Sequence, residues 1–294
     1  MSSTPPKRPS GPPPSAGVLA RYAQSYGREI GVAEGRVRGW VAYMVLAGLL
    51  ERAADRGGGY KFTIKGGVAL ELRLRERARA TKDIDLVLHD SHVDLTVALE
   101  RATAEYSEER VVDGDQGFRF QRRRSPVSLD NGTVNVELAV TYRGGSWTTI
   151  SVDIARAESG EEEVEMLDAV QFEETLGIVG PSRVPCLPLR FHIAQKIHGM
   201  TLPPRTGRHN ERFKDLVDLM LMESMVSDYE GLREACELVF ASRGTHGWPP
   251  PLELTAHWEK GYETLATDLG LPVVYAAEAM DRVRVLVGRI CAAP

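Results

Sequence analysis

The hydrophobic pattern of the chain changes part-way along its length. In the first part, short stretches alternate between apolar and polar residues, which is the pattern of β-strands with one buried face. These stretches centre on Phe62 and Ile64, on Ile84 to Leu88, on Phe118 and Phe120, on Val134 to Val140, and on Ile150 to Ile154. From Pro188 onward, apolar residues recur at helical spacing up to the C-terminus. The pattern predicts an α/β part followed by an all-α part.

Helices are predicted in both parts. Val37, Trp40, Val41, Met44 and Val45 recur every three or four residues and predict the buried stripe of a helix. The predicted helices cover 18–30, 32–54, a segment after Val68, a segment from a cap at Asp90 or Ser91 to about Tyr106, and then 188–201, 211–227, 229–242, 252–268 and 272–291.

Proline and glycine indicate the domain boundaries. Residues 1–17 are rich in Pro, Ser and Gly and are predicted to form a disordered tail. The stretch from Gly180 to Pro188 is rich in the same breakers. It separates a predicted α/β domain of residues 18–185 from a predicted helical domain of residues 186–294.

Composition limits the class of protein. The chain has 294 residues, 43% of them hydrophobic, enough for one large or two medium domains. Its three cysteines show no metal-ligand or disulfide spacing, and the N-terminus carries no apolar signal segment. The apolar run from Val41 to Leu50 is too short to span a bilayer. These features predict a soluble cytoplasmic protein with no membrane partner.

The charge is unevenly distributed. A formal net charge of −5 does not indicate a nucleic-acid-binding protein. Arginines nevertheless gather in three groups: Arg73, Arg75, Arg77 and Arg79; Arg119, Arg122, Arg123 and Arg124; and Arg205, Arg208 and Arg212. Such runs usually form solvated faces, so these groups are compatible with a polyanionic partner without requiring one.

Two neighbouring segments carry the strongest chemical signal. Lys65, Gly66 and Gly67 lie between a predicted strand and a predicted helix, so backbone N–H groups at the helix N-terminus can attract phosphate. Asp83 and Asp85 share one face of the next strand, roughly 7 Å apart at Cα, and can reach one divalent cation. No P-loop motif is present. Each segment alone is ordinary, but together they predict a nucleoside triphosphate site.

Further candidate residues follow downstream. Asp153 lies within an alternating strand and is either a third functional acid or a surface acid on an edge strand. Helical spacing places His192 and Lys196 on one face of a helix, and Asp215 and Asp218 on one face of the next. A solvated helix with a salt bridge is the ordinary explanation of the second pattern. The histidines form no metal-binding motif.

These motifs, in this order, resemble those of the AbiEii/MenT-like nucleotidyltransferase toxins of bacterial toxin–antitoxin systems. The matching segments are Ile64 to Leu70, Arg79 to Asp85, Ile193 to His198 and Lys214 to Leu219. The resemblance implies an α/β fold with the mixed sheet and helices of a polymerase-β-type nucleotidyltransferase, followed by an all-α C-terminal part.

The resemblance also implies roles for single residues. The implied catalytic residues are Asp83, Asp85, Lys196 and Asp215. Asp218, three residues further along the same helix, is the replacement candidate if substitution of Asp215 alone has no effect. The implied nucleotide-binding residues are Lys65, Gly66, Gly67, Thr81 and Lys196. Mg²⁺ would be held by Asp83 and Asp85, with Asp153 as a third candidate ligand that the resemblance does not fix. Some partner antitoxins of the family phosphorylate the residue that corresponds to Thr81.

The expected function follows from this resemblance. The protein would be the toxin of a toxin–antitoxin system that adds nucleotides from NTP to the 3′ acceptor end of tRNA, which blocks aminoacylation and translation. Its partners would be a nucleoside triphosphate, tRNA and a cognate antitoxin. The alternatives are a nucleotidyltransferase that modifies a protein or an antibiotic, and a catalytically idle binding module.

Overall fold

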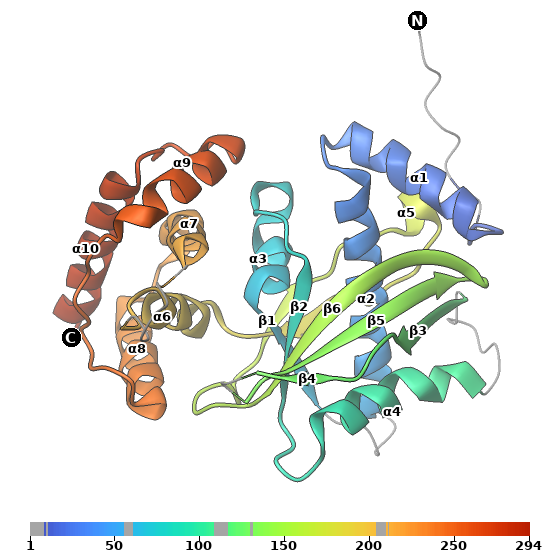
Figure 1. The fold of residues 1–294 in the computed structure, drawn as a ribbon, viewed down its shortest axis with the longest axis horizontal. Coiled ribbons are helices and arrows are strands. Elements are labelled where there is room, and N and C mark those ends of the chain that lie inside the picture. The colour runs from blue at the N-terminus through green and yellow to red at the C-terminus, as the bar shows by residue number, and fades with distance from the viewer. Residues whose placement is uncertain are drawn as a thin grey trace, which may run out of the picture. The chain divides into compact units, whose positions relative to one another are not determined.

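The structure is a computed structural model that describes residues 9, 11–55, 61–108, 117–129, 132–203, 210 and 212–294. The chain divides into two compact units, whose elements are labelled in Figure 1. Unit 1 comprises the described residues within 1–76, 80–157 and 166–186, and unit 2 those within 77–79, 158–165 and 187–294. Most of the predicted tail, residues 1–8 and 10, lies outside the described residues, as do Arg205 and Arg208.

Unit 1 is an α/β unit. Its helices are α1 (Ala16–Glu29), α2 (Glu34–Asp55), α3 (Gly66–Leu74), α4 (Leu95–Glu108) and α5 (Glu173–Leu176), and a short 3₁₀ turn, η1 (Arg75–Arg77), follows α3. Its strands are β1 (Phe62–Lys65), β2 (Asp83–Leu88), β3 (Phe118–Arg122), β4 (Val127–Ser128), β5 (Val134–Tyr142), β6 (Gly145–Arg156), β7 (Glu165–Asp168) and β8 (Arg183–Cys186).

One mixed sheet organises these strands. Their order is β3-β5-β6-β2-β1-β8-β7, and β4 pairs with β5 off this path. β2 runs parallel to β6 and antiparallel to β1, and β1 runs parallel to β8. The strand that carries both candidate acids is therefore central and has a partner on each side. The mixed sheet with helices that the sequence predicts is confirmed.

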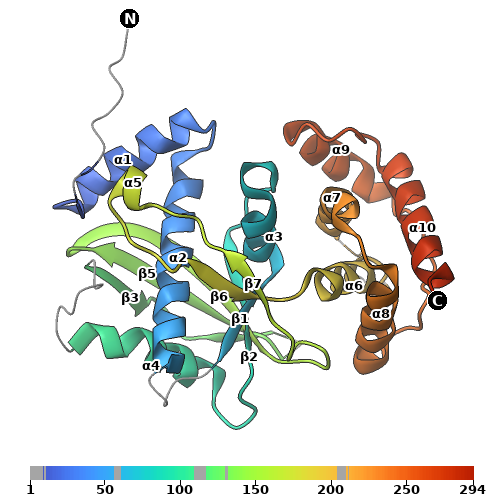
Figure 2. The same cartoon turned by 180° about the vertical axis from the view of Figure 1, so that it is seen from behind.

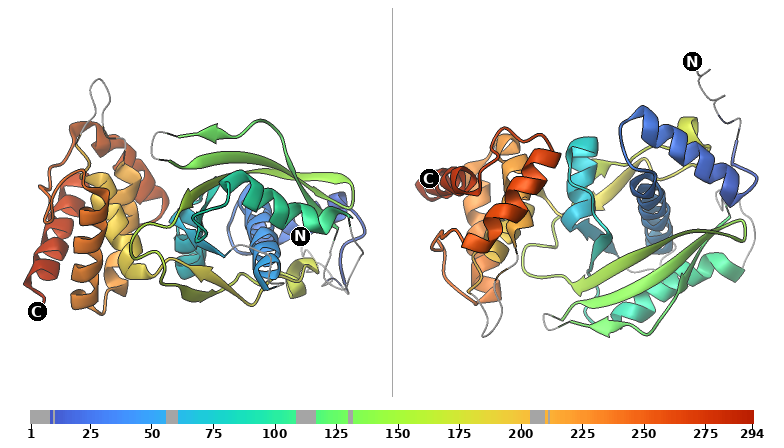
Figure 3. Two further views of the ribbon diagram at one scale, coloured as in Figure 1. Left: turned by 90° about the horizontal axis from the view of Figure 1, so that it is seen from below. Right: turned by 45° about the horizontal axis from the view of Figure 1, so that its top comes forward.

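Alternation along the strands turns one face of the sheet into the core. Ile84 and Leu86 of β2 and Val152 of β6 are fully buried, whereas the acids between them are only partly exposed. Figure 3 shows the curved sheet partly enclosing α2 and α4, which pack on this apolar face. Burying one such aliphatic side chain stabilises the fold by about 1.5–3 kcal/mol.

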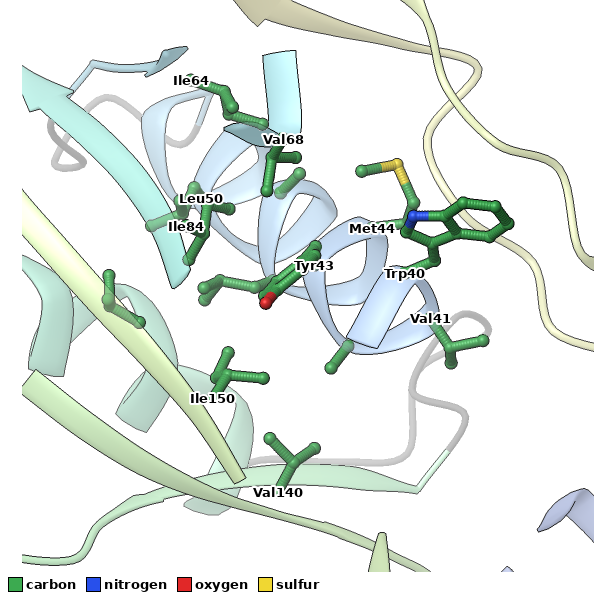
Figure 4. Packing of buried hydrophobic residues seen from close by; sticks show 14 of the residues in the cluster. Trp40, Val41, Tyr43, Met44, Leu50, Ile64, Val68, Ile84, Val140 and Ile150 are labelled. Carbon is green, nitrogen blue, oxygen red and sulfur yellow. The ribbon is translucent and has the colours of Figure 1, made fainter. Parts of the chain in front are cut away.

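Helix α2 supplies the largest apolar surface to this core. Val37, Trp40, Val41 and Met44 are all buried, as the sequence predicts, while Val45 is only partly buried. Figure 4 shows Tyr43 and Leu50 of α2 on the side of Ile84 and Ile150, and Trp40 and Met44 on another side of the helix, while Figure 2 shows the full length of α2. The opposite face of the sheet is thereby left to the polar residues.

The hairpin between β5 and β6 closes with a two-residue loop. Arg143 and Gly144 have φ values of +45° and +77°, so both lie in the left-handed region that a type I′ turn requires. The register then pairs Tyr142 with Gly145. A register shift between Val140 and Thr141 follows, so the turn and this irregularity together set which residues of β6 lie opposite those of β5.

Unit 2 is helical. Its helices are α6 (Leu189–Met200), α7 (Phe213–Met222), α8 (Tyr229–Arg243), α9 (Glu259–Asp268) and α10 (Ala276–Ala292), with 3₁₀ turns η2 (Glu223–Met225) and η3 (Ala256–Trp258). Fully buried apolar residues such as Ile197, Leu216 and Met280 come from three of these helices. The α6 N-terminus is capped by Glu165, whose Oε2 accepts a hydrogen bond from Leu189 N at 3.0 Å. The all-α C-terminal part that the sequence predicts is confirmed.

Some predicted boundaries are wrong. Helix α4 begins at Leu95 because Asp94 accepts hydrogen bonds from the next turn, whereas Asp90 binds the N–H of His92 in a separate turn. The helix predicted from 252 begins only at Glu259, and the carbonyl of Leu252 accepts a hydrogen bond from Arg284 instead.

The stretch from Gly180 to Pro188, predicted only as a domain boundary, also contains a strand. It includes β8, where Cys186 pairs with Ile64 of β1. The strand has only four residues and Pro185 interrupts its alternation, so the pattern gave no strand signal. Among the residues that the structure describes, no helix combines the length and apolar character that a membrane crossing requires.

Candidate active site

The turn at Gly66 and Gly67 lies directly against two other candidate residues. Helix α3 begins at Gly66, whose φ of +61° is in the left-handed region that favours glycine. A Cβ atom added to Gly66 would lie 1.8 Å from Oδ2 of Asp85, and one added to Gly67 would lie 2.5 Å from Oγ1 of Thr81. The absence of side chains at both positions therefore permits this close approach.

The N-terminus of α3 is suited to an anion. Its N-cap residue is Lys65, which has an extended backbone and makes no side-chain capping hydrogen bond. The N–H groups of a first helical turn carry a partial positive charge, which attracts phosphate groups. This end of the helix lies where the carboxylate of Asp85 approaches the backbone, so anion-binding and cation-binding groups are adjacent.

Strand register brings the candidate acids together. Asp85 on β2 pairs with Lys65 on β1 and with Asp153 on β6, and Asp83 pairs with Ser151 on β6. Neighbouring strands are about 4.8 Å apart, so these side chains are neighbours on the partly exposed face of the sheet. Unit 1 therefore gathers Lys65, the glycine turn, Thr81 and the three candidate acids Asp83, Asp85 and Asp153.

Thr81 is fixed beside the first acid. Its Oγ1 lies 3.1 Å from both the carbonyl oxygen and Oδ1 of Asp83, and donates to them. The backbone N–H of Lys82 donates to the same Oδ1 at 3.2 Å. These bonds orient the Asp83 carboxylate, because a carboxylate that accepts two hydrogen bonds has few alternative rotamers.

Asn135 is a site residue that the sequence reasoning missed. Its Nδ2 donates to Oδ1 of Asp153 at 2.5 Å and to Oγ of Ser151 at 2.7 Å. Burial raises the pKa of Asp153, the hydrogen bond from Asn135 lowers it, and the nearby charge of Asp83 raises it again. The signal in the sequence was the position of Asn135 on the polar side of an alternating strand.

We expect Asp153→Asn to raise the melting temperature at pH 7. The folded-state pKa of Asp153 is raised above 3.8, so the ionised form destabilises the folded state once the pH exceeds that folded value. Asparagine stays neutral and removes this effect. Thermal unfolding in EDTA should show a gain at pH 7 that vanishes near pH 4. A variant that melts below the wild type at pH 7 would contradict this.

A buried ion pair joins α3, the helix that follows the glycine turn, to α2. Glu71 of α3 is 3% exposed, and Nε of Arg36 on α2 donates to its Oε1 at 2.8 Å. Arg36 also donates to the carbonyl of Arg75 at the end of α3. Burial raises the pKa of Glu71 and the Arg36 charge opposes the rise. The sequence does not indicate this pair, because the position of Glu71 in its helix is also that of an ordinary surface charge.

The acids also make their surroundings negative. The pKa of Tyr43 on α2 is raised by burial first, and then by the charges of Glu71, Asp83 and Asp85. No group of three His, Cys, Asp or Glu side chains within the described residues is assembled tightly enough to hold a metal ion. Asp83 and Asp85 with Asp153 are nonetheless the oxygen donors that Mg²⁺ prefers, and the mutual repulsion of Asp83 and Asp153 is relieved by a cation.

The candidate residues of unit 2 form a buried charge network. Nζ of Lys196 lies 2.7 Å from Oδ1 of Asp215 and 2.8 Å from Oδ2 of Asp218. Burial lowers the pKa of Lys196, but the two carboxylates outweigh this effect and raise it. Burial raises the pKa of Asp218, but Lys196 and Arg79 lower it below its usual range. The solvated salt bridge considered from the sequence is therefore wrong, because Asp218 is 0% exposed and Asp215 4%.

The remaining candidates behave differently. His192 is buried at 1% exposed, and the side chain of Lys196 is 12% exposed. Several arginines of the predicted groups are paired with acids or backbone carbonyls. The pairs are Arg75 with the carbonyl of Asp168, Arg79 with Asp218, Arg122 with Glu100, Arg123 and Arg124 with Glu137, and Arg212 with Asp215.

The mixed sheet followed by helices is a nucleotidyltransferase fold. Residues 48–279 match the family model "Nucleotidyl transferase AbiEii toxin, Type IV TA system", so the chain belongs to this family. It is a nucleotidyltransferase and the toxin of a toxin–antitoxin system. The resemblance inferred from the four motifs is confirmed.

A solved structure of a nucleotidyltransferase toxin has the same fold. The nucleotidyltransferase toxin MenT4 from Mycobacterium tuberculosis aligns with a TM-score of 0.60 at 20% identity, covering 95% of this chain and 90% of that chain. An antigenic nucleotidyltransferase-like protein from Paracoccidioides brasiliensis aligns with a TM-score of 0.37 at 16% identity, covering 68% of this chain and 87% of that chain. No curated protein matches the chain.

Proposed function

We propose that this toxin transfers a nucleotide from NTP to the 3′ hydroxyl of tRNA, in a Mg²⁺-dependent reaction, and so blocks aminoacylation and translation. The observation that carries the reaction type is the approach of the glycine turn to Asp85 and Thr81, because it joins a phosphate-binding helix end to a pair of carboxylates. The tRNA acceptor is what the resemblance of the four motifs to the AbiEii/MenT-like toxins implies, and the family match supports the nucleotidyltransferase and toxin part of the proposal.

The metal would be held by Asp83 and Asp85, with Asp153 as a third ligand. Mg²⁺ bound there supplies charge neutralisation of the triphosphate oxygens and a lower pKa for the acceptor hydroxyl. Asp83 is oriented for this task by Thr81, and Asp153 by Asn135. The backbone N–H groups of Gly66 and Gly67 bind the triphosphate at the start of α3, with Lys65 and Thr81 beside them.

The transfer itself is a substitution at the α-phosphorus. The acceptor hydroxyl oxygen forms a bond to the α-phosphorus, the bond from that phosphorus to the oxygen bridging to the β-phosphate breaks, and pyrophosphate leaves. The hydroxyl proton passes to a carboxylate, for which Asp153 is a candidate because its raised pKa makes it a better proton acceptor than an ordinary aspartate. The protein mainly positions the reactants and offsets phosphate charge.

Lys196 and Asp215 are proposed to complete the reaction from the helical unit. Lys196 keeps its positive charge at every physiological pH, because Asp215 and Asp218 raise its pKa despite burial. It is therefore suited to bind a phosphate group, and Asp215 to orient it or to act as the catalytic carboxylate. A phosphoryl group added by an antitoxin to Thr81 would place negative charge next to Asp83 and oppose nucleotide binding.

We expect the purified protein to label tRNA from an α-labelled nucleoside triphosphate when Mg²⁺ is present. Periodate oxidation of the tRNA removes the 3′ hydroxyl and should abolish labelling, because the nucleophile is lost. Untreated and mock-treated tRNA serve as controls. Binding of the tRNA should weaken steeply as the salt concentration rises, since each phosphate contact releases counterions.

Other outcomes select the alternatives. Undiminished labelling of oxidised tRNA excludes the 3′ hydroxyl as the acceptor. Label found only in protein or in an aminoglycoside supports transfer to that acceptor instead. Absence of label in every acceptor, with each of the four triphosphates, would support a binding module without catalytic activity.

A further inference from the structure

One buried carboxylate joins two cations from distant parts of the sequence. Asp218 of α7 is 0% exposed. Arg79 donates to it twice, from Nε to Oδ1 at 2.8 Å and from Nη2 to Oδ2 at 3.0 Å. Nζ of Lys196 on α6 lies 2.8 Å from Oδ2 of the same carboxylate. A two-point guanidinium–carboxylate contact fixes the orientation of both groups, which a single contact does not.

Arg79 lies in a short segment of unit 2 between two segments of unit 1, so its contact with Asp218 also fixes the start of the next segment of unit 1. Residues 77–79 belong to unit 2, whereas the residues on both sides of them belong to unit 1. The chain thus leaves unit 1 after α3, forms the contact with Asp218 through Arg79, and returns to unit 1. Thr81 and Asp83 follow Arg79 by two and four residues, so their backbone starts from a point held by Asp218.

Stability alone does not account for such a network. Arg79 and Lys196 balance the charges of Asp215 and Asp218, and the four side chains are between 0% and 14% exposed. Replacing a buried ion network by well-packed apolar residues is often neutral or stabilising, so the fold does not need these charges for its core. What the network provides is fixed geometry for Lys196 and for the segment before β2.

We propose that Asp218 and Arg79 are positioning residues of the transfer reaction. Asp218 orients the ammonium group of Lys196 and, through Arg79, holds the segment that leads into Thr81 and Asp83. The inference rests on the proposed roles of Lys196 and Asp83. It assigns to Asp218 and Arg79 a task without contact with the substrate.

The first test compares substitutions within one segment. Arg79→Gln removes the positive charge and the two-point contact with Asp218. Arg79→Lys keeps the charge but loses the two-point contact. Arg77→Gln is the control, because it changes an exposed arginine of the same segment. We expect Arg79→Gln to lower kcat for nucleotide transfer about a hundredfold with KM for NTP changed less than about threefold. Arg79→Lys should recover part of this loss, and Arg77→Gln should match the wild type.

The second test asks whether Arg79 acts through Asp218. Asp218→Asn should lower kcat at least as much as Arg79→Gln, and the double variant should be within about threefold of Asp218→Asn alone. Losses that multiply would mean that the two residues act independently, which overturns the proposal. So would an Arg79→Gln protein that melts at a lower temperature yet keeps wild-type kcat and KM below that temperature.

Nucleotide binding without an acceptor separates this inference from the proposed function. Asp218→Asn should weaken binding of a non-hydrolysable triphosphate analogue about tenfold, because Lys196 loses one of the two carboxylates that orient it. If wild-type protein fails to label tRNA but Asp218→Asn still weakens binding, the acceptor assignment is wrong and the positioning role stands. If wild-type protein labels tRNA and both variants equal it in transfer and binding, the positioning role is wrong.

Discussion

Replacing Asp83 or Asp85 with asparagine is expected to lower nucleotide transfer at least about a thousandfold, equivalent to about 4 kcal/mol of lost transition-state stabilisation. Asparagine keeps the size of the side chain at both positions, and at position 83 Thr81 can still donate to its oxygen. Only the negative charge and one metal-binding oxygen are lost. Transfer should be measured at saturating Mg²⁺, with growth arrest on expression as a second measurement.

The matched control is Asp268→Asn, which removes an exposed carboxylate at the end of α9 in unit 2. This variant should keep wild-type transfer. The Asp83 variant should melt at or above the wild-type temperature without metal, because it removes the charge that raises the pKa of Asp153. Full transfer activity in either variant would exclude the metal assignment, and loss of folding would instead assign both aspartates to stability.

The sequence predicts the strands well where one face is apolar and the other polar. β5 alternates along most of its length, and β2 and β6 alternate over Asp83 to Leu86 and over Ile150 to Ile154, so the buried face of each follows from the pattern. β4, β7 and β8 have four residues or fewer and show no such alternation, so they could not be found in this way. Their place in the sheet is set by partner strands far away in sequence.

The candidate site divides in the same way. Residues in contiguous motifs, such as Gly66, Asp83 and Asp85, are visible because their spacing carries the chemistry. Asn135 is invisible because its role depends on the register between β5 and β6. Arg36 is invisible because its partner Glu71 lies 35 residues away on another helix.

The network in unit 2 shows a further limit of spacing arguments. The i, i+3 relation of Asp215 and Asp218 is that of any solvated helix face. The structure instead buries both side chains against Lys196 of the preceding helix. Burial of a charge depends on what packs over it, and the residue that covers Asp218 is Arg79, 139 positions earlier in the chain. A pattern read within one helix contains no information about such a partner.

Gly66→Ala is expected to inactivate the enzyme because its methyl group would displace Asp85. Gly31→Ala is the control, because it introduces the same backbone strain without such a contact. Both glycines have left-handed backbones, with φ of +61° at Gly66 and +71° at Gly31, so alanine strains each by about 1–2 kcal/mol. A Cβ atom at Gly31 meets nothing within 4 Å, whereas one at Gly66 lies 1.8 Å from Oδ2 of Asp85. Gly31→Ala should therefore lower the melting temperature and leave transfer unchanged.

In Gly66→Ala the carboxylate of Asp85 has to move from 1.8 Å to at least the 3.0 Å that real Cβ contacts keep, and the start of α3 has to shift with it. Displacements of about 1 Å at reacting groups lower rates about a hundredfold, so kcat should fall by that factor or more beyond any effect of stability. Assays at a temperature where both variants remain folded measure this difference. Equal activity of the Gly66 and Gly31 variants would show that the glycine turn accommodates a methyl group, and that its contact with Asp85 is not required for the reaction.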